Sequence, residues 1–307
     1  MKTRIESRIR KTWKVVHSVS SDMFSKGRIN TLLIMAILFQ GSISLCAMDK
    51  EEFFRLLDQI GSQKYDEVEE FLSTNKDTLS TDPEYFVLLL NYAISKEGPK
   101  LTIGKGRPKP GELALSDPKT GEVVGFMGER VPFDSSLIEE SAKRAQAAIP
   151  HFQNRLDIHF GILIAAEKIG RWDMVADQIV SMLKISKQNN NHWEWGPVNS
   201  MNGDPKEFMI QNILPYTSRM FRAETEAADT ALQRCSEQLI QSYPELIYGY
   251  ANMGVLNLAK KNYDKAREYF LKAKAIDPND EIVKGNLELL QRLEANEKNS
   301  SSPAPNE

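Results

Sequence analysis

Histidines are the side chains best suited to proton transfer or metal binding near neutral pH, and this sequence spreads its four far apart. They are His17, His151, His159 and His192. None belongs to a His-Glu-x-x-His motif, and the two cysteines are not paired at the spacing of a zinc site. The sequence therefore predicts no metal centre.

Carboxylate pairs are the next candidates for chemistry, because two converging carboxylates can act as acid and base. Glu69-Glu70 and Glu139-Glu140 are consecutive, so on a helix their side chains diverge by about 100°. No Gly-x-Ser-x-Gly nucleophile motif occurs. Gly104-x-Gly106 has Lys109 where a dinucleotide-binding loop needs its third glycine, so we interpret this segment as an ordinary loop. We expect no enzymatic activity and no cofactor.

A polar run from Gln188 to Pro197 contains two tryptophans, Trp193 and Trp195. Two indole rings in such a loop can form an aromatic platform for a ligand. They can equally pin a long loop onto neighbouring helices. The first interpretation predicts a small-molecule or carbohydrate-binding module, or an enzyme of uncharted type, that uses this loop and the β-hairpin described below. Both interpretations remain open at this point.

The strongest pattern in the chain is a pair of short amphipathic helices between Leu246 and Pro278. Asp264 is placed to cap the start of the second helix, and Pro278 ends it. Small residues at Gly254 and Ala266 allow the two helices to approach closely. Phe270 then fills the space between them.

This pattern resembles the tetratricopeptide repeat (TPR), a helix–turn–helix of about 34 residues. With Ile247 as the first position, the family's signature positions hold Tyr250, Met253, Gly254, Ala266, Phe270, Ala273 and Pro278. Met253 replaces the usual leucine, and Asn257 replaces the usual tyrosine. The resemblance implies a fold that binds a protein or peptide and rarely catalyses a reaction.

The resemblance also implies where a partner binds, because the first helix of each TPR lines the concave face. That helix would present Tyr248, Asn252 and Val255 to the partner. Some TPR proteins hold a C-terminal carboxylate with lysine, asparagine and arginine, and Asn252 matches one of these positions. Ile282 and Asn286 stand where the next repeat would need lysine and arginine, so we do not expect such a clamp.

Helical periodicity recurs upstream, and His159 occupies the position equivalent to Tyr250, which favours a packing role. A Gly- and Pro-rich insertion contains a predicted β-hairpin, Glu112–Ser116 with Glu122–Met127, whose apolar side chains we expect to pack on neighbouring helices. The predicted fold is an all-α, TPR-like α-solenoid with this small insertion. The expected segments are a leader (1–47), degenerate helical repeats (48–96), the insertion (97–133), degenerate TPR-like helices (134–243), the TPR with a capping helix (244–295) and a disordered tail (296–307).

The N-terminus has the pattern of a secretory signal peptide. An apolar run, Leu32–Phe39, follows basic residues and precedes small residues up to Ala47, where we expect cleavage. Retention as an anchor and lipidation at Cys46 are the alternatives, and translation can start at Met1 or Met23. The interpretation predicts an exported protein, periplasmic or secreted, that touches a membrane only through a retained or lipidated N-terminus.

Charge narrows the class of partner. Residues 1–47 carry eight basic and two acidic residues, so the remaining chain has 31 basic against 40 acidic residues, a net charge of −9. A nucleic-acid-binding protein needs a basic surface, so we exclude nucleic acid. Cys235 alone remains after cleavage, and we expect it to be a buried apolar residue. The sequence thus predicts a non-enzymatic, exported scaffold whose partner is an unknown protein or peptide.

Overall fold

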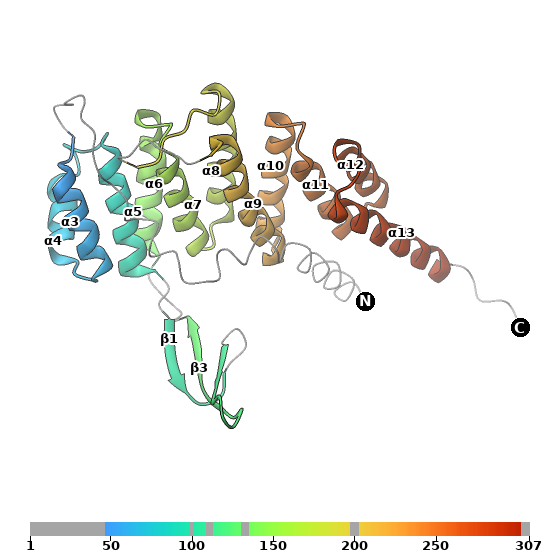
Figure 1. Ribbon diagram of the computed structural model, residues 1–307, viewed down its shortest axis with the longest axis horizontal. Coiled ribbons are helices and arrows are strands. Elements are labelled where there is room, and N and C mark those ends of the chain that lie inside the picture. The colour runs from blue at the N-terminus through green and yellow to red at the C-terminus, as the bar shows by residue number, and fades with distance from the viewer. Residues whose placement is uncertain (1–46, 99–100, 109–112, 130–134, 197–202, 302–307) are drawn as a thin grey trace, which may run out of the picture. The chain divides into compact units, whose positions relative to one another are not determined.

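The computed structural model describes residues 47–98, 101–108, 113–129, 135–196 and 203–301 (Figure 1). Residues 1–46 of the predicted signal sequence, Cys46 among them, and residues 302–307 lie outside the described residues. The described residues form two compact units, one that ends at Arg171 and one that begins at Trp172. The predicted segment 134–243 therefore spans parts of both units.

The first unit consists of helices that pack beside their neighbours in the sequence. They are α3 (Lys50–Gly61), α4 (Asp66–Thr74), α5 (Pro83–Glu97), α6 (Ser136–Ala148) and α7 (Leu156–Lys168), with a short 3₁₀ turn, η2 (Ile149–His151). Aspartates begin two of these helices, because Asp49 accepts the backbone N–H of Glu52 and Asp82 caps α5. Each helix turns an apolar stripe inward, and α5 packs against α3, α6 and α7.

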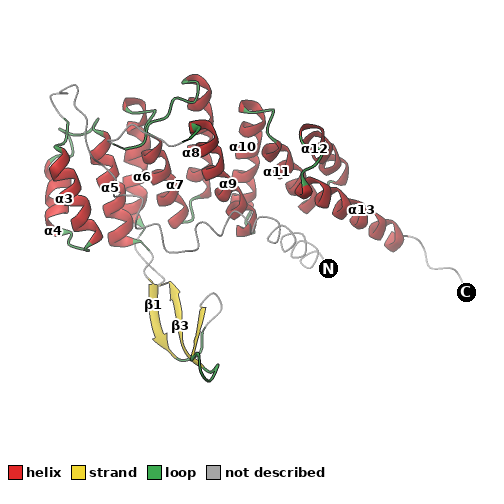
Figure 2. Ribbon diagram, in the orientation of Figure 1, coloured by secondary structure: helices red, strands yellow, loops and turns green. Residues whose placement is uncertain are grey.

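A three-stranded antiparallel sheet is inserted between α5 and α6, and Figure 2 shows it in yellow. Its strands are β1 (Leu101–Lys105), β2 (Leu113–Ser116) and β3 (Val123–Glu129), in the order β1-β3-β2. The predicted hairpin corresponds to β2 and β3. The interpretation of Gly104 as part of a loop is wrong, because Gly104 lies in β1 opposite Phe126. A Cβ atom at position 104 would lie 2.4 Å from the Phe126 ring, so glycine leaves room for that ring.

The sheet does not bury its apolar side chains on the helices in the way that the sequence suggested. Leu113 is 64% exposed and Val123 is 47% exposed, while Leu115 and Phe126 are half-buried. The prediction that all four pack on neighbouring helices is therefore wrong for Leu113 and Val123. The sheet is stabilised mainly by its own ladder and by Phe126 over Gly104.

The second unit continues with helices that pack in sequence order. They are α8 (Trp172–Gln188), α9 (Pro205–Ala223), α10 (Glu226–Ser242), α11 (Ile247–Ala259), α12 (Tyr263–Ile276) and α13 (Glu281–Ser301). Within this unit α10 contacts α8, α9 and α11, and α11 contacts α9, α12 and α13. Pro205 occupies the first turn of α9, where its missing N–H is not needed, and Asp204 caps that turn.

The helices α11 and α12 form the predicted helix–turn–helix. Ala266, Phe270 and Ala273 are fully buried, and a Cβ at position 254 would lie 2.3 Å from the Phe270 ring. Gly254 thus permits the close approach that the sequence predicted. Asp264 does not cap α12, because the helix already begins at Tyr263 and Asn262 is the cap residue. Helix α13 continues to Ser301, past the predicted boundary at residue 295.

The fold class is the predicted one, an all-α, TPR-like α-solenoid with a small β-sheet as an insertion. Within the described ranges, none of the helices combines the length and the apolar character needed to cross a membrane.

Candidate functional site

Helix α11 carries the three residues that were predicted to face a partner. Tyr248 is half-buried, and Gln211 of α9 donates a hydrogen bond from its Nε2 to the Tyr248 hydroxyl at 3.4 Å. Asn252, one turn further along, is 6% exposed. Val255 is only 2% exposed, so its predicted role as a surface contact is wrong. The side chain belongs to the core because α11 is covered by α9, α10, α12 and α13.

Two asparagines that lie one repeat length apart in the chain have unsatisfied amide groups. Asn252 on α11 and Asn286 on α13 are separated by one full period of the repeat. Each is at most 9% exposed, and the Nδ2 atom of each has no hydrogen-bond partner among the described residues. A buried donor without a partner costs about 1–3 kcal/mol. Such groups are rare in folded proteins, so a pair in register is a candidate contact for a partner.

Asn257 on the same helix shows that burial alone does not leave an amide group without a hydrogen-bond partner. It is 9% exposed, as Asn286 is, and its Nδ2 donates to the backbone carbonyl of Met253 at 2.8 Å. The sequence pattern predicted a partner contact at Asn252. Asn286 was considered only because it stands where a carboxylate clamp would need arginine. Counting one repeat period forward from Asn252 would have found Asn286, because the repeat places both on the same helical face.

The loop after α8 pins itself to the helices through Trp193. This side chain is 6% exposed, and its Nε1–H donates to the Ser186 hydroxyl at 3.3 Å. The Tyr243 hydroxyl also donates to the Ser186 hydroxyl, at 2.7 Å, and Ser186 donates to the side-chain oxygen Oδ1 of Asn191 at 2.7 Å. Burial raises the pKa of Tyr243, so the hydroxyl remains a donor. Trp193 therefore holds the loop and offers no platform for a ligand.

Trp195 lies at the end of the same loop, half-buried, with its ring edge-on to Phe208 of α9 at a centroid distance of 5.4 Å. The structure thus places one tryptophan in the core and the other against a helix. The two indole rings do not form the exposed pair that the carbohydrate-binding interpretation requires.

Two of the groups that could do chemistry near neutral pH, His159 and Cys235, are buried. His159 is fully buried, and its Nε2 is 2.9 Å from the carbonyl oxygen of Gln153; burial lowers its pKa to about 4. Burial raises the pKa of the Cys235 thiol to about 12, so the reactive thiolate does not form. Over the described ranges, no three His, Cys, Asp or Glu residues are grouped so that they could hold a metal ion.

A depression with an accessible volume of about 400 Å³ lies between the start of α8 and the start of α10. Its lining residues are Asp173, Glu226, Ala227, Thr230, Ala231 and Arg234. The lining includes none of the predicted site residues. It carries charges of both signs, and Arg234 is already paired with Asp177, so it selects no class of ligand.

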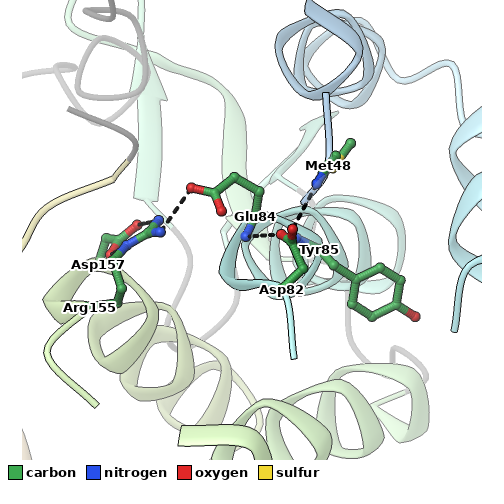
Figure 3. A network of polar contacts seen from close by, with 6 residues as sticks. All are labelled: Met48, Asp82, Glu84, Tyr85, Arg155 and Asp157. Atoms are coloured by element: carbon green, nitrogen blue, oxygen red, sulfur yellow. Dashed lines mark hydrogen bonds and ion pairs between the residues drawn. The ribbon is translucent and has the colours of Figure 1, made fainter. Parts of the chain in front are cut away.

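The first unit contains a buried cluster of charges that sequence reasoning did not find (Figure 3). The Arg155 guanidinium, whose side chain is 7% exposed, donates to Glu84 at 2.8 Å and to both carboxylate oxygens of Asp157 at 2.9 and 3.0 Å. Asp82 lies beside Glu84 and accepts three backbone N–H groups, one of them from Met48. Desolvation raises the pKa of Glu84, and Arg155 opposes that rise. Contacts between residues 71 positions apart leave no local sequence signal.

Comparison with known proteins identifies the repeat itself. Residues 247–280 match the family model of the tetratricopeptide repeat, and this range contains α11 and α12. No curated protein and no solved structure matched the chain.

Proposed function

We propose that this protein, whose residues 247–280 form a tetratricopeptide repeat, is a non-enzymatic scaffold that is exported and binds an extended segment of a partner protein or peptide. The TPR family supports protein–protein interaction in general and is generally non-enzymatic. The binding surface in this proposal is the face shared by α9, α11 and α13, hereafter the asparagine face.

The observation that carries the proposal is the unsatisfied pair, Asn252 and Asn286. An extended peptide exposes a backbone carbonyl at every residue, and such acceptors are what two amide donors in register require. A partner that closes over the asparagine face can satisfy them after a small side-chain rotation. The free protein bears the cost of the unsatisfied donors, and the complex removes it.

Export is supported by the sequence alone. The apolar run Leu32–Phe39 with its basic flank and the small residues up to Ala47 support a periplasmic or secreted location. The acidic balance of the rest of the chain supports a protein partner rather than nucleic acid. The carbohydrate-binding alternative has no supporting observation, because Trp193 is buried and hydrogen-bonded.

Photocrosslinking in cells that express the full chain tests the location of the surface. A benzophenone amino acid replaces Tyr248 on α11, and in a control it replaces Tyr269, another half-buried tyrosine, on α12. The proposal predicts a discrete crosslinked partner at position 248 and none at 269. Equal capture at both positions, or none at 248, would contradict the asparagine face as the binding surface.

A further inference from the structure

Met48 is a buried residue between exposed neighbours, Ala47 before it and Asp49 after it. Ala47 is exposed, whereas Met48 is only 9% exposed. The backbone nitrogen of Met48 donates to Oδ2 of Asp82 at 2.8 Å, in a buried contact between segments distant in the chain (Figure 3). The residue that would follow the predicted cleavage at Ala47 is therefore already fixed to the core by its nitrogen.

Asp82 holds this position because it caps α5. Its Oδ1 accepts the backbone N–H groups of Glu84 at 2.8 Å and Tyr85 at 3.2 Å, which leaves Oδ2 for Met48. The residue is 6% exposed, and no lysine or arginine of the described residues forms an ion pair with it. Asp82 is thus a buried carboxylate bonded only by neutral N–H groups.

The buried charged groups around Asp82 are mostly acidic. Glu84 and Asp157 share the single guanidinium of Arg155, so the buried cluster contains three carboxylates and one cation. Desolvation is the main cause that raises the pKa of Glu84; Arg155 opposes the rise, and the charge of Asp82 adds a smaller contribution to it. An additional positive charge next to Asp82 would offset the repulsion between these carboxylates.

We propose that the chain is cut between Ala47 and Met48, and that the α-ammonium left on Met48 forms a buried ion pair with Asp82. The inference rests on the export route proposed above, which supplies a processing peptidase. Hydrolysis breaks the Ala47–Met48 amide bond. The hydroxyl of water goes to the Ala47 carbonyl carbon, which leaves as a carboxylate, and Met48 Nα gains protons to become an ammonium group.

The cut changes the charge of the contact but leaves its geometry unchanged. The nitrogen that donates to Asp82 as an amide donates as an ammonium from the same place, so a hydrogen bond with charge on the acceptor alone becomes one with charge on both partners. Met48 also precedes the positive end of α3, where a cation is disfavoured. Asp49 at the cap and Glu51 and Glu52 in the first turn offset that effect. Cleavage would thus strengthen the contact between the start of α3 and the start of α5.

The first experiment maps the N-terminus of the exported protein. The full chain is expressed, the envelope and medium are separated from the cytoplasm, and intact mass and N-terminal sequencing are performed on each fraction. We expect the exported chain to begin at Met48. An exported chain that begins at another residue overturns the proposed cut and leaves the scaffold proposal standing. A chain that is found only in the cytoplasm overturns the cut and the export route together, and the crosslinking at position 248 still tests the scaffold.

The second experiment measures the ion pair in that same exported protein with an aldehyde that reacts selectively with N-terminal α-amines. Asp82→Asn is the test variant, because the single carbonyl oxygen of asparagine can still cap α5 as Oδ1 does, whereas its NH2 group takes the place of the Oδ2 that accepts from Met48. We expect labelling of the wild-type protein to be about tenfold slower than labelling of Asp82→Asn, because a charge-assisted bond has to open first. The wild-type protein and Asp82→Asn should be labelled at the same rate once both are unfolded in urea. The control Asp77→Asn, at an exposed aspartate in the turn before α5, should label like the wild type.

A one-residue extension gives an independent readout. A chain that keeps Ala47 has an amide in place of the ammonium at Met48, and we expect its equilibrium constant for unfolding in urea to be about tenfold larger. Asp82→Asn should abolish the difference between the two chains. Equal labelling of Asp82→Asn and wild type, or equal unfolding of the two chains, would overturn the ion pair.

Discussion

Asn252 and Asn257 of α11 are the same residue type at similar burial, and their hydrogen bonds differ. Asn257 donates back to its own helix, whereas the Nδ2 of Asn252 has no partner in the described chain. The amide of Asn257 is satisfied within the fold. The unsatisfied amide of Asn252 lowers the stability of the free protein, and a partner that accepts its hydrogen bond would remove that loss. The same reasoning distinguishes Trp193, whose indole N–H donates to Ser186 inside the fold, from a tryptophan that is available to a ligand.

The burial of His159 predicts how the stability of the protein depends on pH. Its folded-state pKa is about 4, while an unfolded histidine titrates near about 6.5. Between these values the unfolded chain binds a proton that the folded chain does not, so stability present above pH 6.5 is lost as the pH falls towards 4. We expect this residue to contribute a loss of about 3 kcal/mol over that range.

Urea unfolding at several pH values measures this loss. In His159→Gln the contribution should vanish, whatever the variant's stability at neutral pH. The exposed His151→Gln serves as the control and should keep the wild-type slope. A His159→Gln profile parallel to that of the wild type would show that the histidine does not enter the fold in its neutral form.

Arg155 provides the second residue-scale prediction. Replacing it with methionine leaves Glu84 and Asp157 buried without their cation, and we expect a loss of about 3–5 kcal/mol in unfolding free energy. Adding Glu84→Gln should recover part of that loss, because it removes one unpaired charge. Denaturant titration measures both changes.

The matched control is Arg234, whose ion pair with Asp177 is nearly half exposed on both sides. Arg234→Met should cost less than about 1 kcal/mol, since solvent screens an exposed pair. Equal losses at Arg155 and Arg234 would mean that the buried cluster contributes no more than a surface pair does.

At the scale of elements, the close approach of α11 and α12 depends on one missing side chain. Gly254 lies under the Phe270 ring, where a Cβ would approach to 2.3 Å, whereas Gly285 of α13 has open space around it. The same substitution should therefore have opposite effects in the two helices, although both glycines are in helix interiors.

Gly254→Ala should destabilise the protein by about 1–3 kcal/mol through overpacking. Gly285→Ala should stabilise it by about 0.5–1 kcal/mol, because alanine is the better helix former. Thermal or urea unfolding of both variants decides the matter. Phe270→Leu introduced with Gly254→Ala should relieve part of the clash, and a tolerated Gly254→Ala would show that the two helices are not in contact at this position.

At the scale of the whole molecule, local patterns predicted the helices well and non-local pairing poorly. Periodicity and the small residues Gly254 and Ala266 predicted the close pair formed by α11 and α12. Strand β1 escaped prediction because its ladder partner, β3, lies well beyond it in the chain and Gly104 resembles a loop residue. Val255 was assigned to the surface because a family position says nothing about which neighbours cover it.

The candidate site was predictable only in part, because local sequence patterns do not reveal non-local packing. Repeat geometry identified Tyr248 and Asn252, and the period of the repeat could have added Asn286. Whether an amide is satisfied depends on the packing around it, which one sequence does not reveal. The charge cluster around Arg155 and the contact of Met48 with Asp82 join segments that are distant in the chain, so they too required coordinates.

The most direct measurement compares partner affinity with stability in the same variants. Asn252→Leu/Asn286→Leu removes both unsatisfied donors, so the free protein should be as stable as the wild type or more stable. The affinity for the crosslinked partner, measured by titration calorimetry, should fall at least about tenfold. Asn257→Leu, which removes a satisfied amide from the same helix, should leave affinity unchanged. Unchanged affinity in the double variant, or an equal loss in Asn257→Leu, would contradict the asparagine face as the place where the partner binds.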